Sequence, residues 1–314
     1  MTYAFDPELA AALSMLPNLD TDDVVLARAQ MSEMIRSFGE PDTTGVDVRD
    51  ERVPGPDGAP DVLLRVYTPH VRQAPAALYD IHGGGFIVGD IETDHASNLE
   101  FARELGVVVV SVDYRLAPEN PYPAGLEDCY AGLVWTAKNA DALGIDPERV
   151  AIYGASAGGG LAAALALLAR DRGGPAIAFQ YLGIPELDDR LETPSMRAFV
   201  DTPIWNRPKA EHSWDAYLGG TGRRGGADVP VHAAPARATD LSGLPPAYVS
   251  AMQFDPLRDE DIAYAQALLA TGIPVELHVF PGTFHGSGLM AHAAVTQREN
   301  AEALAVLRRA LGIA

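Results

Sequence analysis

From residue 45 onward, short apolar runs alternate with longer segments whose apolar residues recur at helical spacing. Short runs rich in β-branched residues and bounded by glycine, proline or aspartate are typical of strands. The predicted strands are Val46–Val53, Val62–Tyr67, Ala76–Ile81, Val107–Val112, Arg149–Tyr153, Ile177–Leu182, Ala247–Ala251 and Val275–Phe280. The predicted helices after the third strand include Thr93–Leu105, Pro123–Asn139, Ala157–Arg170, Arg258–Ala270 and Thr296–Leu311. This alternation predicts an α/β fold with a mainly parallel, eight-stranded sheet covered by helices on both faces.

Two segments depart from the alternation. Before residue 45 the sequence predicts two helices, one opened by Asp6-Pro7 and one opened by Thr21–Asp23 that ends near Gly39. Between Gly183 and Pro246 the pattern stops in a stretch rich in proline and glycine. Long interruptions of compact folds are usually functional or flexible, so we expect a cap over the carboxyl edge of the sheet, with a partly disordered surface loop as the alternative.

The expected domains follow from these breaks. They are 1–44 for the N-terminal cap helices, 45–183 for the first part of the core, 184–240 for the cap insertion and 241–314 for the second part of the core.

The net charge and the cysteine content disfavour several classes of partner and site. The formal charge is −20, from 43 acidic and 23 basic residues, which disfavours nucleic acids and anionic lipid surfaces as partners. Cys129 is the only cysteine, so there is no intramolecular disulfide or cysteine-based metal site. The acidic start of the chain lacks the pattern of a secretory signal, and we expect a cytoplasmic protein.

The uncharged stretch between Arg149 and Arg170 is long enough to span a bilayer. Glycine interrupts its first half, and its apolar content is mostly alanine. It is therefore interpreted as a buried strand, a tight turn and a buried helix, with no membrane insertion.

Two glycine-rich motifs carry the candidate chemistry. Residues Gly154–Gly158 (GASAG) match the G-x-S-x-G nucleophile elbow, in which glycines allow a sharp turn that exposes Ser156. Upstream, His82–Phe86 (HGGGF) offers backbone without side chains, which can aim N–H donors at the oxyanion formed when a nucleophile attacks an ester. Together the two motifs indicate acyl transfer.

A serine nucleophile needs a base and an acid that orients the base. Asp255 and His285 each follow a predicted strand, at the edge of the sheet where catalytic groups gather. Asp259 and Glu260 compete with Asp255, which is favoured because it lies nearest the strand end. His292 competes with His285 but is expected on a helix among alanines.

The chain resembles the bacterial hormone-sensitive-lipase-like (family IV) carboxylesterases of the α/β-hydrolase superfamily. The resemblance rests on HGGGF, on Asp113–Glu119 (DYRLAPE) with Pro121–Ala124 (PYPA), on the serine elbow, and on the segments around Asp255 and His285. It implies the α/β-hydrolase fold with a helical cap. It departs at Ala155, where these esterases often have aspartate.

The resemblance also implies the roles of the site residues. Ser156 is the nucleophile, His285 the general base and then acid, and Asp255 the residue that orients the imidazole. The oxyanion hole is formed by the Ala157 N–H and by the Gly83, Gly84 and Gly85 loop, with Gly84 and Gly85 favoured. His82 is expected to anchor this loop to nearby backbone.

The expected function is a serine carboxylesterase that hydrolyses small to medium neutral esters through an acyl-Ser156 intermediate. A catalytically silent ligand receptor on the same fold and an amidase or thioesterase remain alternatives. The sequence contains no dinucleotide, phosphate-loop or zinc-protease motif, so no cofactor or metal is expected. The expected partner is the ester substrate alone, and a homodimer is left open. Trp205, Trp214 and Phe38 are candidates to line its pocket.

Overall fold

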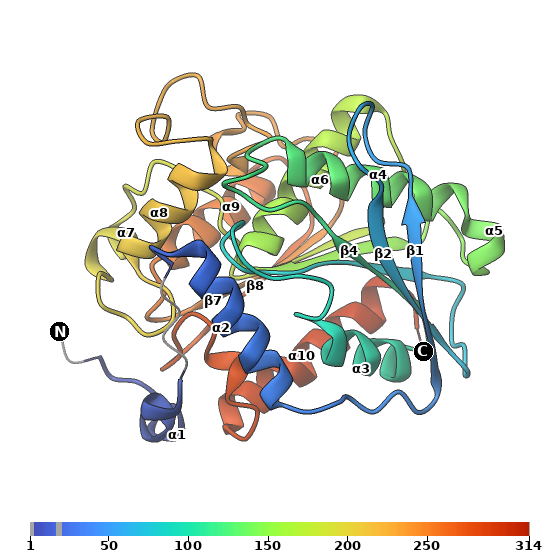
Figure 1. Cartoon of the computed structure of the whole chain (residues 1–314), viewed down its shortest axis with the longest axis horizontal. Coiled ribbons are helices and arrows are strands. Elements are labelled where there is room, and N and C mark those ends of the chain that lie inside the picture. The colour runs from blue at the N-terminus through green and yellow to red at the C-terminus, as the bar shows by residue number, and fades with distance from the viewer. Residues whose placement is uncertain (1–2, 17–20, 314) are drawn as a thin grey trace.

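An eight-stranded sheet in the order β1-β2-β4-β3-β5-β6-β7-β8 forms the centre of the protein (Figure 1). The computed structural model describes residues 3–16 and 21–313. β2 pairs antiparallel with β1 and β4, and the remaining neighbours are parallel, so the predicted mainly parallel α/β sheet is confirmed. The strands are β1 Val46–Val53, β2 Val62–Pro69, β3 Ala77–Ile81, β4 Val108–Asp113, β5 Val150–Ala155, β6 Phe179–Gly183, β7 Ala247–Met252 and β8 Val275–Phe280.

Helices cover both faces of the sheet. α3 (His95–Leu105) and α10 (Ala294–Ala310) lie on one side, and α4 (Ala124–Lys138) and α6 (Ala157–Arg172) lie on the other (Figure 1). α5 (Ala140–Leu143) and α9 (Arg258–Ala270) contribute to the same core as α4 and α6. Both faces of the inner strands β3 to β7 are thus mostly removed from water, as their near-continuous apolar runs predict, whereas the edge strands β1 and β8 stay partly exposed.

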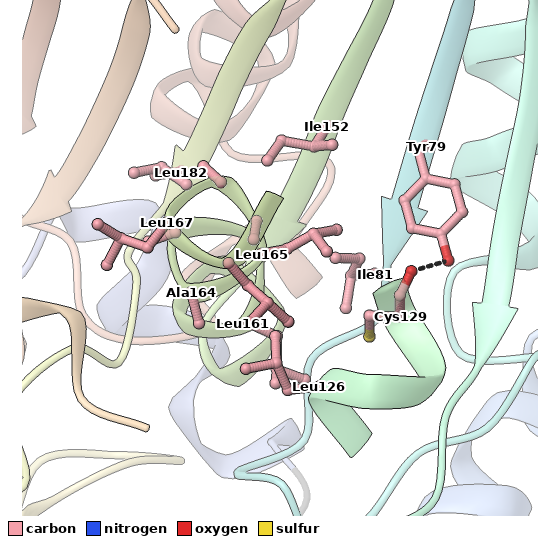
Figure 2. Close-up of a cluster of buried hydrophobic side chains, with 14 of the residues drawn as sticks. Tyr79, Ile81, Leu126, Cys129, Ile152, Leu161, Ala164, Leu165, Leu167 and Leu182 are labelled. Carbon is pink, nitrogen blue, oxygen red and sulfur yellow. Dashed lines mark hydrogen bonds between the residues drawn. The ribbon is translucent and has the colours of Figure 1, made fainter. Parts of the chain in front are cut away.

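β3 illustrates how one strand supplies both cores. Successive side chains of a strand point to opposite faces. Tyr79 and Ile81 therefore pack with α4 and α6, whereas Leu78 packs with α3 and α10. The buried Tyr79 hydroxyl donates a hydrogen bond to the carbonyl of Cys129 at 2.9 Å, which satisfies its polar atom within an apolar layer (Figure 2).

The two N-terminal helices begin where the sequence predicts. Asp6 caps α1 (Pro7–Ala12), and Asp23 caps α2 (Val24–Ser37); each carboxylate accepts a backbone N–H, at 2.9 and 3.0 Å. A short 3-10 turn, Leu13–Met15, follows α1. Residues 1–2 and 17–20 of the expected N-terminal segment lie outside the described residues.

The 184–240 segment contains helices, as a helical cap implies, at positions that the sequence pattern did not predict. They are α7 (Pro194–Ala198) and α8 (Arg207–Tyr217), with a 3-10 turn at Pro235–Arg237. α8 packs on core elements: Trp214 and Tyr217 contact Phe86 at ring distances of 5.4 and 4.1 Å. α7 and α8 are therefore packed on the rest of the protein, whereas residues 219–223 form exposed turns.

Several predicted boundaries shift because pairing, and not local apolarity, sets the ends of a strand. β6 begins at Phe179 and not at Ile177, because its first sheet partner is Ala151 of β5. Both strands then run on to the pair Ala155 and Gly183. The stretch between Arg149 and Arg170 is indeed a strand, a turn and a helix. No helix in the described ranges is long and apolar enough to cross a membrane.

The start of α6 lies in direct backbone contact with the end of β3. A Cβ added at Gly158 would come within 2.0 Å of the carbonyl oxygen of Ile81. A Cβ at Gly154 would meet the carbonyl oxygen of Gly158 at 2.3 Å. Both atoms belong to rigid backbone, so neither position can accept a side chain without displacing a central strand or the helix.

We therefore expect Gly158→Ala to lower the free energy of unfolding by about 3 kcal/mol or more, the upper range for overpacking a core. Urea denaturation measures this directly. Gly288→Ala is the matched control, because nothing lies within 4 Å of the added methyl group, and it should change stability by less than about 0.5 kcal/mol. Equal stability of the two variants would contradict the close-contact argument.

Candidate active site

Ser156 occupies the turn between β5 and α6 in a conformation that L-residues rarely adopt, with φ 58° and ψ −125°. Backbone hydrogen bonds hold this strained turn. The Ser156 N–H donates to the carbonyl of Gly183 at 2.8 Å. Its own carbonyl accepts from the N–H groups of Gly160 and Glu186, at 3.0 and 3.1 Å. The hydroxyl therefore projects from the end of the strand, as the elbow motif predicts.

His285 and Asp255 lie beside this hydroxyl. The Nε2 atom of His285 is 2.9 Å from Ser156 Oγ, and its Nδ1 atom is 2.7 Å from Asp255 Oδ2. The other carboxylate oxygen of Asp255 accepts the N–H of Leu257 at 2.9 Å. With Nδ1–H donating to the carboxylate, Nε2 is left to accept the serine proton. The three side chains singled out in the sequence are thus connected by hydrogen bonds.

The competing acids make other contacts. Asp259 accepts the N–H of Ser195 at 2.8 Å, and Glu260 accepts the N–H of Leu187 at 2.7 Å. Neither carboxylate has a hydrogen bond to His285 within the described residues. Both instead attach α9 to the 184–240 segment.

The two other histidines of interest also lie apart from the serine hydroxyl. His292 is exposed in a turn before α10, so its predicted place on a helix is wrong. His82 is buried, and its Nδ1–H donates to the carbonyl of Gly83 at 2.8 Å while its ring stacks on Tyr114. Burial lowers the pKa of His82 to about 4, so this side chain is a neutral anchor of the glycine loop.

Hydrogen bonds fix the orientation of the peptide planes in the glycine loop. In a trans peptide the carbonyl and the following N–H point in opposite directions. The Gly83 carbonyl faces His82, so the N–H of Gly84 points away from it. The Gly84 carbonyl accepts from two backbone N–H groups further along the loop at 3.1 and 3.0 Å, so the N–H of Gly85 points the other way.

The same reasoning applies to Ala157. The Ser156 carbonyl is held by two donors, so the Ala157 N–H of the same peptide points out of the start of α6, where helix N–H groups lack intrahelical partners. In the part of the chain that the structure describes, the N–H groups of Gly84, Gly85 and Ala157 have no hydrogen-bond acceptor. These N–H groups are free to bind an anionic oxygen.

A cavity of about 1250 Å³ reaches Ser156 and His285. This volume suits a small-molecule ligand. Trp205 and Phe38, two of the three aromatic residues that the sequence analysis named as candidates, line this cavity. Trp214 instead is fully buried against Phe86. The remaining apolar lining includes Met31, Met34, Ile35, Ile184, Ile204 and Leu289.

Part of the cavity wall is charged, and its charged groups include an ion-paired cluster. Arg65 forms ion pairs with Asp50 at 2.7 Å and with Glu92 at 2.8 Å, and all three line the cavity. Over residues 3–16 and 21–313, no three histidine, cysteine, aspartate or glutamate side chains gather in an arrangement suited to a metal ion.

Two residues that touch this site were missed in the sequence. Ser213 of α8 donates its hydroxyl proton to the carbonyl of Gly85 at 2.7 Å, and Glu186 donates its backbone N–H to Ser156. Ser213 has no local signal, because a serine within an irregular segment is unremarkable. Glu186 does have a local signal in the sequence, because it closely follows a predicted parallel strand, where functional side chains gather.

Comparisons with known proteins show which family the chain belongs to. A family model described as the alpha/beta hydrolase fold matches residues 78–289. The carboxylesterase NlhH of Mycobacterium tuberculosis is 40% identical over 312 residues, covering 98% of this chain and 96% of the relative. The esterase LipI of the same organism is 39% identical over 289 residues, covering 90% and 88%.

A solved structure described as a bacterial heroin esterase has a TM-score of 0.96 and 53% sequence identity, covering 98% of each chain. Together with the family match, these similarities extend over nearly the whole sequence. The chain therefore belongs to the α/β-hydrolase superfamily, in its hormone-sensitive-lipase-like (family IV) carboxylesterase family.

Proposed function

We propose that this protein is a serine carboxylesterase that hydrolyses small to medium neutral carboxylic esters through an acyl-Ser156 intermediate. The observation that carries the proposal is the continuous set of hydrogen bonds from Ser156 Oγ through His285 to Asp255, at 2.9 and 2.7 Å. Membership of an esterase family and the carboxylesterase relatives support ester hydrolysis as the reaction.

Acylation begins with attack of Ser156 Oγ on the ester carbonyl carbon, while His285 Nε2 accepts the hydroxyl proton. Asp255 holds the imidazole in place and stabilises the imidazolium that forms. The carbon–oxygen bond to the alcohol then breaks, and His285 returns the proton to the departing alkoxide. A water molecule repeats the sequence on the acyl-enzyme, which releases the acid and restores the serine.

The oxyanion of each tetrahedral intermediate is bound by the N–H groups of Gly84, Gly85 and Ala157. Their lack of a protein acceptor and the fixed orientation of their peptide planes support this role. Donors held in place before the reaction need no reorganisation when charge develops, which makes this contribution large. Gly83 contributes through its carbonyl, which anchors the loop to His82.

The cavity supports a neutral ester as substrate. Its wall combines apolar side chains with charged groups, among them Arg65, which is already paired to two carboxylates. The overall charge of −20 further disfavours anionic substrates. The single cysteine, Cys129, is a buried free thiol, in keeping with the cytoplasmic location expected from the sequence.

Ser156→Ala should lower turnover of a chromogenic butyrate ester by up to about 10⁶-fold, because it removes the nucleophile. Thermal unfolding should stay close to that of the wild type, which separates lost chemistry from lost folding. Residual activity near the wild-type level would refute the assignment. A wild-type protein that binds the ester without hydrolysing it would favour a silent receptor.

Asp255→Asn should lower kcat by about 10⁴-fold, because an amide cannot hold His285 in the tautomer that accepts the serine proton. Asp259→Asn is the matched control: it lies on the same segment but contacts Ser195 instead of the imidazole. This control should stay within about threefold of the wild type. Steady-state kinetics on both variants decides between the two acids, and equal losses would contradict the role of Asp255.

A further inference from the structure

Glu186 is a buried acid that the proposed reaction does not use. It follows β6, and its side chain is 0% exposed. Its backbone N–H donates to the Ser156 carbonyl at 3.1 Å. Its carboxyl oxygen Oε1 lies 3.4 Å from Ser213 Oγ on α8, and the other carboxyl oxygen has no partner within the described residues.

The hydrogen bonds of Ser213 determine whether the carboxyl group of Glu186 carries a proton. A serine hydroxyl has one proton to donate. The Gly85 carbonyl, 2.7 Å away, can only accept, so the Ser213 proton is committed to that shorter bond. A hydrogen bond between Ser213 Oγ and Glu186 Oε1 then requires the carboxyl group to donate. Glu186 is therefore a neutral carboxylic acid when this chain of hydrogen bonds is complete.

This chain reaches two residues that flank the proposed oxyanion hole. The carboxyl group of Glu186 acts through Ser213 on the Gly85 carbonyl, and its backbone N–H acts on the Ser156 carbonyl, which orients the Ala157 N–H. Gly85 has φ 56°, and a Cβ there would lie 2.5 Å from the Trp205 ring. The loop is thus confined by packing and then oriented by hydrogen bonding.

We propose that Glu186 is a positioning residue that, as a neutral acid, holds Gly85 of the oxyanion loop in place through Ser213 and thereby couples α8 to catalysis. This inference rests on the proposed esterase function. Ionisation of Glu186 removes the donor, leaves a carboxylate competing with the Gly85 carbonyl for the single Ser213 proton, and releases Gly85. Turnover should therefore fall when the acid ionises, without any change in the three residues that carry out the chemistry.

The surroundings of Glu186 favour the neutral form. Burial raises the pKa of Glu186 to about 8 and the charge of Asp255 adds to this shift, whereas a hydrogen bond donated by Ser213 to the ionised carboxylate opposes it. Glu260 on α9 and Tyr217 on α8 also interact with it electrostatically. These neighbours are acids, and none of them supplies a positive charge that would stabilise a carboxylate here.

Glu186→Gln tests the protonation state. Its amide N–H₂ can donate to Ser213 as the neutral acid does, but it cannot ionise. We expect its kcat for a butyrate ester at about pH 7 to stay within about threefold of the wild type. Above about pH 8, kcat of the wild type should fall and that of the variant should not. Glu299→Gln, at an acid of α10 whose pKa burial raises to about 7, is the control that should keep the alkaline decline.

Ser213→Ala tests the bridge itself. It should lower kcat about tenfold, with KM changed less than about twofold, because it affects the oxyanion hole and not substrate binding. The alkaline decline should also disappear, since ionisation no longer reaches Gly85. A purely structural role would instead lower thermal stability and leave the pH profile unchanged.

Infrared difference spectroscopy gives a readout that does not depend on activity. In the difference spectrum between the wild type and Glu186→Gln, a protonated-carboxyl stretch should be present at neutral pH and fade as pH rises past about 8. Absence of this band, or a wild-type kcat that stays flat up to about pH 10, would overturn the proposal. If the wild type fails to hydrolyse esters while the band is present, the esterase assignment fails and the positioning role fails with it, whereas the protonation of Glu186 stands.

Discussion

The turn at Ser156 depends on backbone segments that approach too closely for any side chain. Gly158 lies against the carbonyl of Ile81, and Gly154 lies against Gly158 itself. This contact joins the start of α6 to the end of β3, and it forces Ser156 into a left-handed conformation that exposes its hydroxyl. Close packing of backbone is therefore what converts an ordinary strand-helix connection into a site for chemistry.

The parallel sheet then determines which residues the hydroxyl can meet. Parallel neighbours end on the same edge, so loops that follow different strands converge there. Asp255 follows β7 and His285 follows β8, and the two segments meet Ser156 although they are far apart in sequence. Each residue could be predicted because a local signal, its place just after an apolar run, coincides with this general property of parallel sheets.

The contacts of the 184–240 segment could not be predicted in the same way. Ser213 and Gly85 are 128 residues apart, and neither lies in a pattern that constrains the other. The sequence does contain a start signal for α8. Asn206 caps the helix and a proline follows in its first turn, as at many helix starts. Local rules thus account for the existence of α8, whereas its position depends on packing of Trp214 and Tyr217 on Phe86.

The distribution of charge around Asp255 follows from the partners of each carboxyl group. His285 and the N–H of Leu257 donate to the two oxygens of Asp255. Asp261, equally buried, has no hydrogen-bond donor for either oxygen among the described residues, and burial raises its pKa.

Burial likewise raises the pKa of Glu186 and Glu260. Donors stabilise a carboxylate, and burial without them favours the neutral acid. Asp255, with a donor on each oxygen, faces the imidazolium that acyl transfer creates. Glu186 and Glu260 instead form hydrogen bonds with the 184–240 segment.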